Sequence, residues 1–226
     1  MKIFSLICLL ALAASNAFAD AASELASFSV FDKVDLAALA KDPSVAHGTP
    51  MNGSYISAQS CFVVAGPPSR VADALRQWNP ARHSELKVLL HSDLPSAAGP
   101  ANFSRLSSAP NNAAVQSLVS ATQKGSTDLQ ISKEEAKKLP IGSAGGAMPA
   151  PVASFWAGVL SGRARAFSSG GTGAQPPYDH TGRSVRPSAE FNGLMQQQDK
   201  IRKQFSGLID SSGNGRGGPE LFWELL

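Results

Sequence analysis

The chain has 226 residues and a formal net charge of +3, with 20 Lys and Arg against 17 Asp and Glu. Its length suits one domain with a sizeable buried core. A charge excess this small is typical of a solvated surface, and because the chain carries no recognised nucleic-acid-binding motif we expect no nucleic-acid partner.

Residues 1–19 predict a secretory signal peptide. Lys2 supplies a positive charge, residues 3–12 form a short apolar run, and Ala17-Phe18-Ala19 has the pattern of a cleavage site. The run is shorter than the roughly 20 residues that a membrane-spanning helix needs. We therefore expect cleavage after Ala19, export to a periplasm or the cell exterior, and a single soluble domain over residues 20–226 without an integral membrane segment.

The cysteines are consistent with a domain that needs no covalent cross-link. Cys8 lies inside the predicted signal peptide, so only Cys61 would remain after cleavage. An intramolecular disulfide is therefore not expected, although export leads to oxidising compartments. Cys61 lies in an apolar segment without basic neighbours, which predicts a small buried side chain rather than a reactive thiol.

A short helix and a strand–helix–strand unit are predicted in the first half of the mature chain. Asp35 is placed to cap a helix that runs to Lys41. The parts of the unit are a strand at 55–64, a turn at Gly66-Pro67-Pro68, a helix at 69–78 and a strand at 85–91. Ser69 is expected to cap this helix, and Asn79-Pro80 to end it.

The helix at 69–78 is amphipathic. Val71, Leu75 and Trp78 follow helical spacing, so one face is apolar and should be covered by other segments. The succession of strand, Gly-Pro-Pro turn, helix and strand over residues 55–94 resembles the opening of helix-grip lipid-binding domains. That resemblance implies a curved antiparallel sheet with a long final helix. The chain shows too few strands to complete such a sheet, and no functional residue carries over.

The middle of the chain predicts a long loop with short helices. Within residues 95–127, only a weak helix at 113–121 is expected, with Val115, Leu118 and Val119 facing inward. Ser132 followed three residues later by Glu135 fits a capping box that begins a short, exposed helix.

Two longer amphipathic helices are predicted in the second half. The helix at 151–167 has an apolar stripe of Val152, Phe155 and Val159, which Trp156 and Leu160 widen. The stripe of the helix at 187–209 consists of Phe191, Leu194, Ile201, Phe205 and Leu208. The prediction is an α+β fold, with a small sheet near the N-terminal half, two or three amphipathic helices packed on it, and a helix-rich C-terminal half.

The end of the chain has two features. Asp210, Ser212, Asn214 and Gly215 match the opening of an EF-hand calcium loop, but Leu221 stands where the bidentate carboxylate is needed. We therefore interpret residues 210–220 as a Gly-rich turn. The large apolar groups of Leu221–Leu226 read as the start of a strand or helix, and one hypothesis is a truncated C-terminus.

No catalytic motif, cofactor-binding motif or metal site is evident. The densest polar cluster is Tyr178, Asp179 and His180 beside Arg183 and Arg186. One alternative is therefore a secreted hydrolase that uses this cluster with His83 or His91, provided that folding brings them together. A surface turn is the simpler interpretation of the cluster.

The favoured function is a non-enzymatic binding or interaction protein, similar to many exported bacterial proteins. We expect its pocket between the strand–helix–strand unit and the helices that begin at Pro151 and Pro187. The ligand-binding candidates are Trp78, His83, Trp156, Tyr178, Asp179, His180 and Arg183. A hydrophobic small molecule is the preferred ligand, because apolar aromatic groups are abundant and convergent catalytic groups are not. A further alternative is a subunit that docks on a protein partner through its apolar C-terminus.

Overall fold

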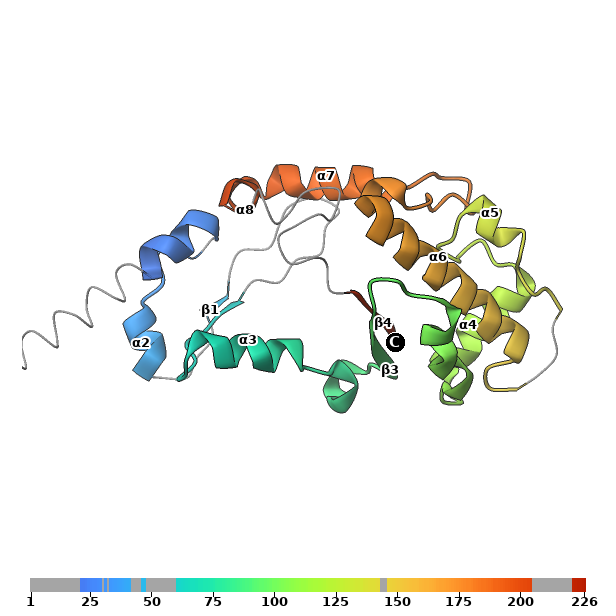
Figure 1. Cartoon of the computed structure of the whole chain (residues 1–226), viewed down its shortest axis with the longest axis horizontal. Coiled ribbons are helices and arrows are strands. Elements are labelled where there is room, and N and C mark those ends of the chain that lie inside the picture. Colours follow the sequence, from blue (N-terminus) through green and yellow to red (C-terminus); the bar gives the residue numbers. More distant parts are fainter. Residues whose placement is uncertain are drawn as a thin grey trace, which may run out of the picture. The chain divides into compact units, whose positions relative to one another are not determined.

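The computed structural model describes residues 21–29, 31, 33–41, 46–47, 60–142, 146–204 and 221–226. The predicted signal peptide, most of the predicted strand at 55–64 and the EF-hand-like loop lie outside the described residues. Helices and short strands are mixed along the chain, which confirms the α+β prediction (Figure 1). The chain divides into two compact units. The first unit comprises Met1–Trp78 with Leu194–Ser206, and the second comprises Asn79–Gly193 with Gly207–Leu226.

The first unit combines short helices with a short two-stranded sheet. Residues 21–28 are helical. They are followed by α2 (Leu36–Lys41), β1 (Ala46–His47), β2 (Ser60–Cys61) and α3 (Pro68–Arg76), with α8 (Asp199–Gln204) contributed from later in the chain. β1 and β2 pair antiparallel. Lys200 of α8 donates hydrogen bonds of 3.0 Å to the carbonyl oxygens of Ala26 and Ser29, which joins α8 to the helix at 21–28.

The caps of this unit confirm one prediction and correct another. The Asp35 carboxylate accepts a 2.9 Å hydrogen bond from the Ala38 N–H at the start of α2, as predicted. α3 also forms where a helix was expected, but its N-cap is Pro67 and not Ser69. Pro67 has an extended backbone, and Pro68 occupies the first helical position, where its fixed φ and missing N–H are tolerated. Ser69 is therefore already inside the first turn.

The prediction that other segments cover the apolar face of α3 is wrong within the described residues. No residue of α3 is buried, and Leu75 and Trp78 are 71% and 50% exposed. The hydrophobic spacing of Val71, Leu75 and Trp78 correctly predicts the helix itself. It does not predict burial, which depends on whether another element packs on that face.

The second unit is built on a two-stranded sheet formed by distant parts of the sequence. β3 (Leu90–Leu94) pairs antiparallel with β4 (Leu221–Leu225), with Leu90 opposite Leu225 and Leu94 opposite Leu221. Trp223 is buried, its ring lies 5.7 Å from that of Phe103, and its Nε1–H donates a 3.2 Å hydrogen bond to the Asn102 carbonyl. The apolar C-terminal segment, expected to begin a strand or a helix, thus forms a strand and contributes to the core.

The second strand of the predicted strand–helix–strand unit lies later in the chain than predicted. Two 3₁₀ turns follow Asn79, η1 (Pro80–Arg82) and η2 (Ser84–Leu86), so the predicted stop at Asn79-Pro80 is confirmed. Lys87 then adopts a left-handed conformation with φ 55°, which no continuous strand accommodates. The strand therefore begins at Leu90 rather than at Glu85.

The segment predicted as a long loop contains two helical elements, η3 (Pro100–Ser108) and α4 (Ala113–Lys124). Val115 and Val119 of α4 are buried, as predicted. Asn112 caps α4 by accepting a 2.9 Å hydrogen bond from the Val115 N–H. The sequence gives no warning that η3 places Phe103 and Leu106 in the core, because polar and small residues surround them.

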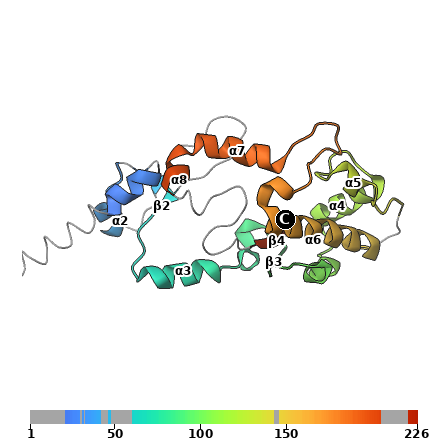
Figure 2. The ribbon, with the colours of Figure 1, turned by 45° about the horizontal axis from the view of Figure 1, so that its top comes forward.

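α6 (Ala150–Ala174) is the longest element and lies beside α4 in both ribbon views (Figures 1 and 2). Its predicted stripe is confirmed, since Val152, Phe155 and Val159 are all buried. The helix continues beyond the predicted end at Phe167, although Gly170 and Gly171 inside it have non-helical backbone angles.

The helix predicted at 187–209 is interrupted. α7 (Pro187–Gln197) ends before Gln198, and α8 begins at Asp199, whose carboxylate pairs with Arg202 and Lys203 in the new first turn. No residue of α7 is buried, so the predicted inward stripe is only half-buried at Phe191 and Leu194. Within the described ranges, no helix has the length and hydrophobicity to cross a bilayer.

Candidate ligand-binding site

The site begins with α5 (Lys133–Ala136), whose start is fixed by the predicted capping box. The Ser132 hydroxyl accepts a 3.1 Å hydrogen bond from the Glu135 N–H, and the Glu135 carboxylate accepts one of 2.6 Å from the Ser132 N–H. The Lys133 N–H, which has no partner inside so short a helix, donates to the Asp179 carboxylate at 2.7 Å. The N–H groups of Ser132, Lys133 and Glu135 at the start of α5 therefore all have hydrogen-bond acceptors.

Arg163 of α6 joins α5 to the segment that follows α6. Its Nε and Nη2 donate to the two Glu135 carboxylate oxygens at 3.0 Å and 2.7 Å, a bidentate geometry. The Arg163 and Glu135 side chains are only 10% and 16% exposed. The guanidinium also lies 4.2 Å from the centre of the Tyr178 ring, within reach of a cation–π interaction. Through this one buried charge pair, α6 is connected both to α5 and to the segment that follows α6.

A cavity of about 740 Å³ lies against α6 and α5. One wall is a face of α6 made of small side chains, Ser154, Gly158, Ser161 and Gly162, which recur three or four residues apart. A Cβ atom placed on Gly158 or Gly162 would meet no atom within 4 Å, so both glycines border open space.

The apolar part of the lining comes from α6 and from prolines beside it. Phe155 and Val159 supply side chains that also belong to the core. Pro151 lines the cavity near the start of α6, with Pro100 and Pro176 contributed by η3 and by the segment after α6. The lining residues of α6 run from Pro151 to Arg165, which is about 21 Å along a helix that rises about 1.5 Å per residue. The cavity is therefore elongated.

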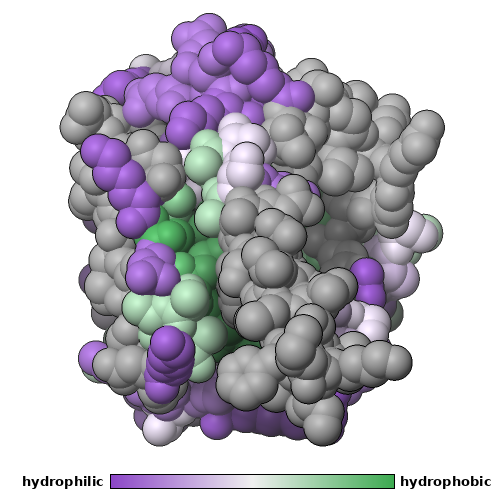
Figure 3. Space-filling view, turned by 90° about the vertical axis from the view of Figure 1, so that its left-hand side faces the viewer, coloured by the Kyte–Doolittle hydropathy of each residue, from purple (hydrophilic) through white to green (hydrophobic). Residues whose placement is uncertain are grey.

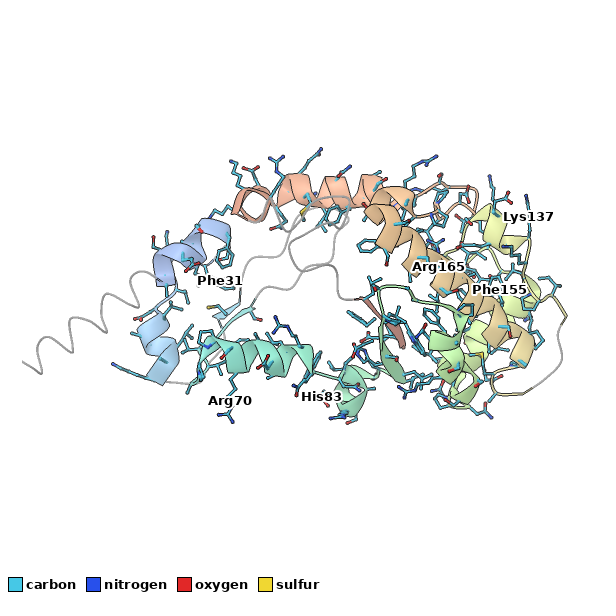
Figure 4. All side chains as sticks on the ribbon, viewed as in Figure 1. Phe31, Arg70, His83, Lys137, Phe155 and Arg165 are labelled. Atoms are coloured by element: carbon cyan, nitrogen blue, oxygen red, sulfur yellow. The ribbon has the colours of Figure 1, made fainter. Side chains whose placement is uncertain are left out.

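Charged side chains line the other part of the cavity. Glu135, Lys138 and Arg165 all contribute to the lining, and Lys138 and Arg165 are exposed to solvent. Arg165 Nε donates a 3.3 Å hydrogen bond to the Ser161 carbonyl. Figure 4 shows Arg165 and Phe155 on α6, with Lys137 just after the neighbouring α5. Within the described part of the chain, neither Lys138 nor Arg165 pairs with a carboxylate, whereas Glu135 is neutralised by Arg163.

The predicted polar cluster lies next to this site, but its side chains have other contacts. Tyr178 lies against Arg163 and pairs through its backbone with Val185, and Asp179 holds the α5 N-terminus. The His180 N–H donates to the Ile131 carbonyl at 3.1 Å, and its buried Nε2 has no hydrogen-bond partner among the described residues. Arg183 is exposed. Of this segment, only Pro176 lines the cavity.

The remaining candidate residues are held elsewhere. His83 Nδ1 lies 3.2 Å from a Glu85 carboxylate oxygen. His91 lies on β3 between Glu224 at 3.1 Å and Asp93 at 3.4 Å. These histidines therefore contact carboxylates near their own strand or turn, and neither lines the cavity.

The two candidate tryptophans also have different positions. Trp156 packs against the core and donates a 3.0 Å hydrogen bond from Nε1 to the Thr122 hydroxyl. That contact is typical of a core tryptophan with a satisfied polar edge. Trp78 is half-exposed at the end of the first unit. Neither tryptophan lines the α5–α6 cavity.

A second, shallower cavity of about 440 Å³ lies within the first unit. It is lined by the helix at 21–28, Leu36 and the segment Cys61–Val64, and Glu24 is the one charged residue among the described residues that line it. Figure 3, which views the molecule from the side of α2 in Figure 1, shows hydrophobic residues gathered in a hollow between hydrophilic ones. Cys61 is a half-buried free cysteine rather than the fully buried residue that its apolar neighbours predict.

The sequence reasoning missed the residues that line the larger cavity. The spacing of Gly158 and Gly162 was the available signal, but glycines four apart suggest close helix packing as readily as open space. Lys138 and Arg165 gave no signal, because isolated basic residues are common on solvated helix faces. In the described ranges, no group of three or more His, Cys, Asp or Glu residues is placed to hold a metal ion.

Comparison of the chain with protein-family models, with curated proteins and with solved structures finds no match. The function of the protein therefore has to be inferred from the geometry of its own residues.

Proposed function

We propose that the protein is an exported, non-enzymatic binding protein that holds a small, largely apolar molecule in the cavity between α5 and α6. The observation that carries this proposal is the cavity itself. Its volume of about 740 Å³ falls within the about 300–1,000 Å³ that is usual for ligand sites. Export is supported by the signal-peptide pattern of residues 1–19.

The glycines of α6 support a site that is kept open. Glycine inside a helix costs about 1 kcal/mol relative to alanine. At Gly158 and Gly162 no neighbouring atom prevents a larger residue, so packing does not require glycine. Side chains at these positions would extend into the cavity. The two helix-weakening residues thus stand where a ligand needs the room.

The contacts of the polar cluster favour binding over a hydrolase. Asp179 accepts the Lys133 N–H, and Tyr178 lies against the Arg163 guanidinium. Both side chains therefore have structural roles, and a catalytic acid or base has to exchange protons with a substrate. Among the described residues, the lining includes no histidine, cysteine or tyrosine. This lining suits an apolar ligand bound by Phe155 and Val159 better than a substrate that is hydrolysed.

The proposal is tested by native mass spectrometry of the chain purified from its export compartment. The wild type should carry a co-purifying small molecule, and Gly158→Leu should lose it because the leucine side chain would project into the space that the ligand occupies. Gly173→Leu is the matched control, since Gly173 lies beyond the non-helical Gly170 and Gly171, has equal space around its Cβ position, and does not line the cavity. The control should keep the ligand.

Two results would contradict the proposal. A wild-type chain without any bound molecule would remove the support for a constitutive ligand, and a ligand retained by Gly158→Leu would place binding outside this cavity. The same spectra test export, because cleavage after Ala19 gives a chain that begins at Asp20. An uncleaved chain would argue against the export part.

A further inference from the structure

We infer that the ligand of the α5–α6 cavity is an elongated amphipathic carboxylate, whose anionic head group is bound by Lys138 and Arg165. The inference rests on the proposed function and names the chemical class of its ligand. It follows from the charge of the cavity, from the position of that charge along α6, and from the length of the apolar lining.

The charge of the cavity is positive. Three charged residues line the cavity in the part of the chain that the structure describes, and one of them, Glu135, already forms a bidentate pair with Arg163 and so contributes little net potential. Lys138 and Arg165 have no carboxylate partner in the part of the chain that the structure describes. An anion entering this space therefore meets two cations whose charges are not yet compensated.

Arg165 also has donors available for a ligand. Its Nε donates a hydrogen bond to the Ser161 carbonyl, which restricts the position of the guanidinium group. Its two terminal nitrogens have no hydrogen-bond partner among the described residues. A planar guanidinium matches the two oxygens of a carboxylate, and the Lys138 ammonium can add a point charge beside them.

Both cations line the same cavity. Arg163 pairs with Glu135, so α5 lies level with the part of α6 that carries Arg165, although Arg163 and Arg165 point to different sides of the helix. Lys138 follows Glu135 by three residues, and its N–H donates a 3.0 Å hydrogen bond to the Glu135 carbonyl in the turn after α5. The apolar side chain of Phe155 lies ten residues, or about 15 Å along α6, from Arg165. A charged head and a long apolar body fit this arrangement.

The experiment compares two probes of similar size by isothermal titration calorimetry on the mature chain. Decanoate carries the carboxylate, and decan-1-ol replaces it with a hydroxyl, both used below their aggregation concentrations. The wild type should bind decanoate more tightly than decan-1-ol. Because Lys138 and Arg165 are exposed to solvent, the decanoate affinity should fall as the salt concentration rises.

The double variant Lys138→Gln/Arg165→Gln should lower the decanoate affinity by about tenfold or more and change the decan-1-ol affinity by less than about twofold. Lys137→Gln is the control, since Lys137 lies on the same turn of the chain, is exposed, and does not line the cavity. It should bind both probes as the wild type does. All three substituted residues are at the surface, so circular dichroism should show an unchanged fold.

Different failures have different meanings. If both probes bind equally, or if the double variant binds decanoate like the wild type, the head-group inference is wrong. The cavity proposal then survives provided that Gly158→Leu abolishes binding of both probes. If Gly158→Leu binds both probes normally, or if the wild type binds neither, the proposed function is wrong and the inference fails with it.

Discussion

Arg163→Met tests whether the buried charge pair organises the site. The substitution keeps a long apolar side chain but removes the two hydrogen bonds to Glu135, a contact of 3.4 Å from Nη1 to the Pro176 carbonyl, and the cation above Tyr178. It leaves the Glu135 carboxylate 16% exposed and without its cation. The free energy of unfolding should therefore fall.

The burial of the pair sets the magnitude. An exposed ion pair contributes about 0–1 kcal/mol, whereas removing one partner of a buried pair costs about 3–5 kcal/mol. The Arg163 and Glu135 side chains are 10% and 16% exposed, which places the pair in the second class. Glu135 still accepts the Ser132 N–H after the substitution, which offsets part of the loss. We expect a loss of about 3 kcal/mol.

An ion pair at the C-terminal end of α5 provides the matched control. Lys137, the residue after α5, and Glu134 form a pair at 2.6 Å, but their side chains are 68% and 78% exposed. Lys137→Met should therefore cost less than about 1 kcal/mol. Urea unfolding followed by circular dichroism measures both variants, with the midpoint and slope fitted separately so that a change in slope reveals lost cooperativity.

A double-mutant cycle separates the pair from its surroundings. Glu135→Gln keeps an oxygen that can cap the Ser132 N–H, and it removes the carboxylate charge. The double variant Arg163→Met/Glu135→Gln should be less destabilised than the sum of the single variants, because no buried charge is left unpaired. If Arg163→Met is no more destabilising than Lys137→Met, the reasoning from burial is refuted.

Three smaller predictions concern helices and charge. Gly158→Ala should raise the thermal unfolding midpoint by about 2–4 °C, because about 1 kcal/mol of helix propensity is gained without a clash; calorimetry showing a decrease would contradict the open space found there. Asn112→Ala should cost about 1 kcal/mol in urea unfolding, since the cap on the Val115 N–H is lost. Hydrogen bonds from Lys203 and then Arg202 lower the pKa of Asp199. The ionised Asp199 carboxylate should therefore stabilise α8 at pH values above the ordinary pKa of an aspartate, and this effect should be lost as the pH falls through the lowered pKa. Carboxyl-carbon NMR should show a higher titration midpoint for Asp199 in Lys203→Met.

Local patterns predicted the elements whose residues supply their own evidence. The capping box of Ser132 and Glu135, the Asp35 cap and the buried stripe of α6 are all read from residues within one or two turns. These interactions form between near neighbours in sequence, so the pattern and the structure coincide.

Tertiary packing decided the features that the sequence did not reveal. β4 was expected to be a strand or helix, but its pairing with β3 joins residues more than a hundred positions apart. η3 lacked a periodic pattern, yet packing against α6 places Phe103 in the core. The reverse holds for α3, whose stripe is clear but whose Leu75 is exposed. Whether an apolar face becomes buried depends on a partner that local sequence does not specify.

Arg163 and Arg165 show the same limit at the candidate site. They are two residues apart on α6, so their side chains differ in direction by about 200° around the helix axis. Arg163 is buried against Glu135, whereas Arg165 is exposed at the cavity. Nothing in the two residues themselves assigns these different environments. The position of α5 does so, because it supplies Glu135 to one side of the helix and leaves the other cation without a carboxylate.

This difference predicts separate effects for the two arginines. Arg165→Gln should weaken decanoate binding and leave the free energy of unfolding within about 0.5 kcal/mol of the wild-type value, as is usual for a surface substitution. Arg163→Met should lower the midpoint and also weaken binding, because α5 and Lys138 lose the contact that positions them. If Arg165→Gln destabilises the chain as much as Arg163→Met, then Arg165 supports the fold, and the assignment of its donors to a ligand fails.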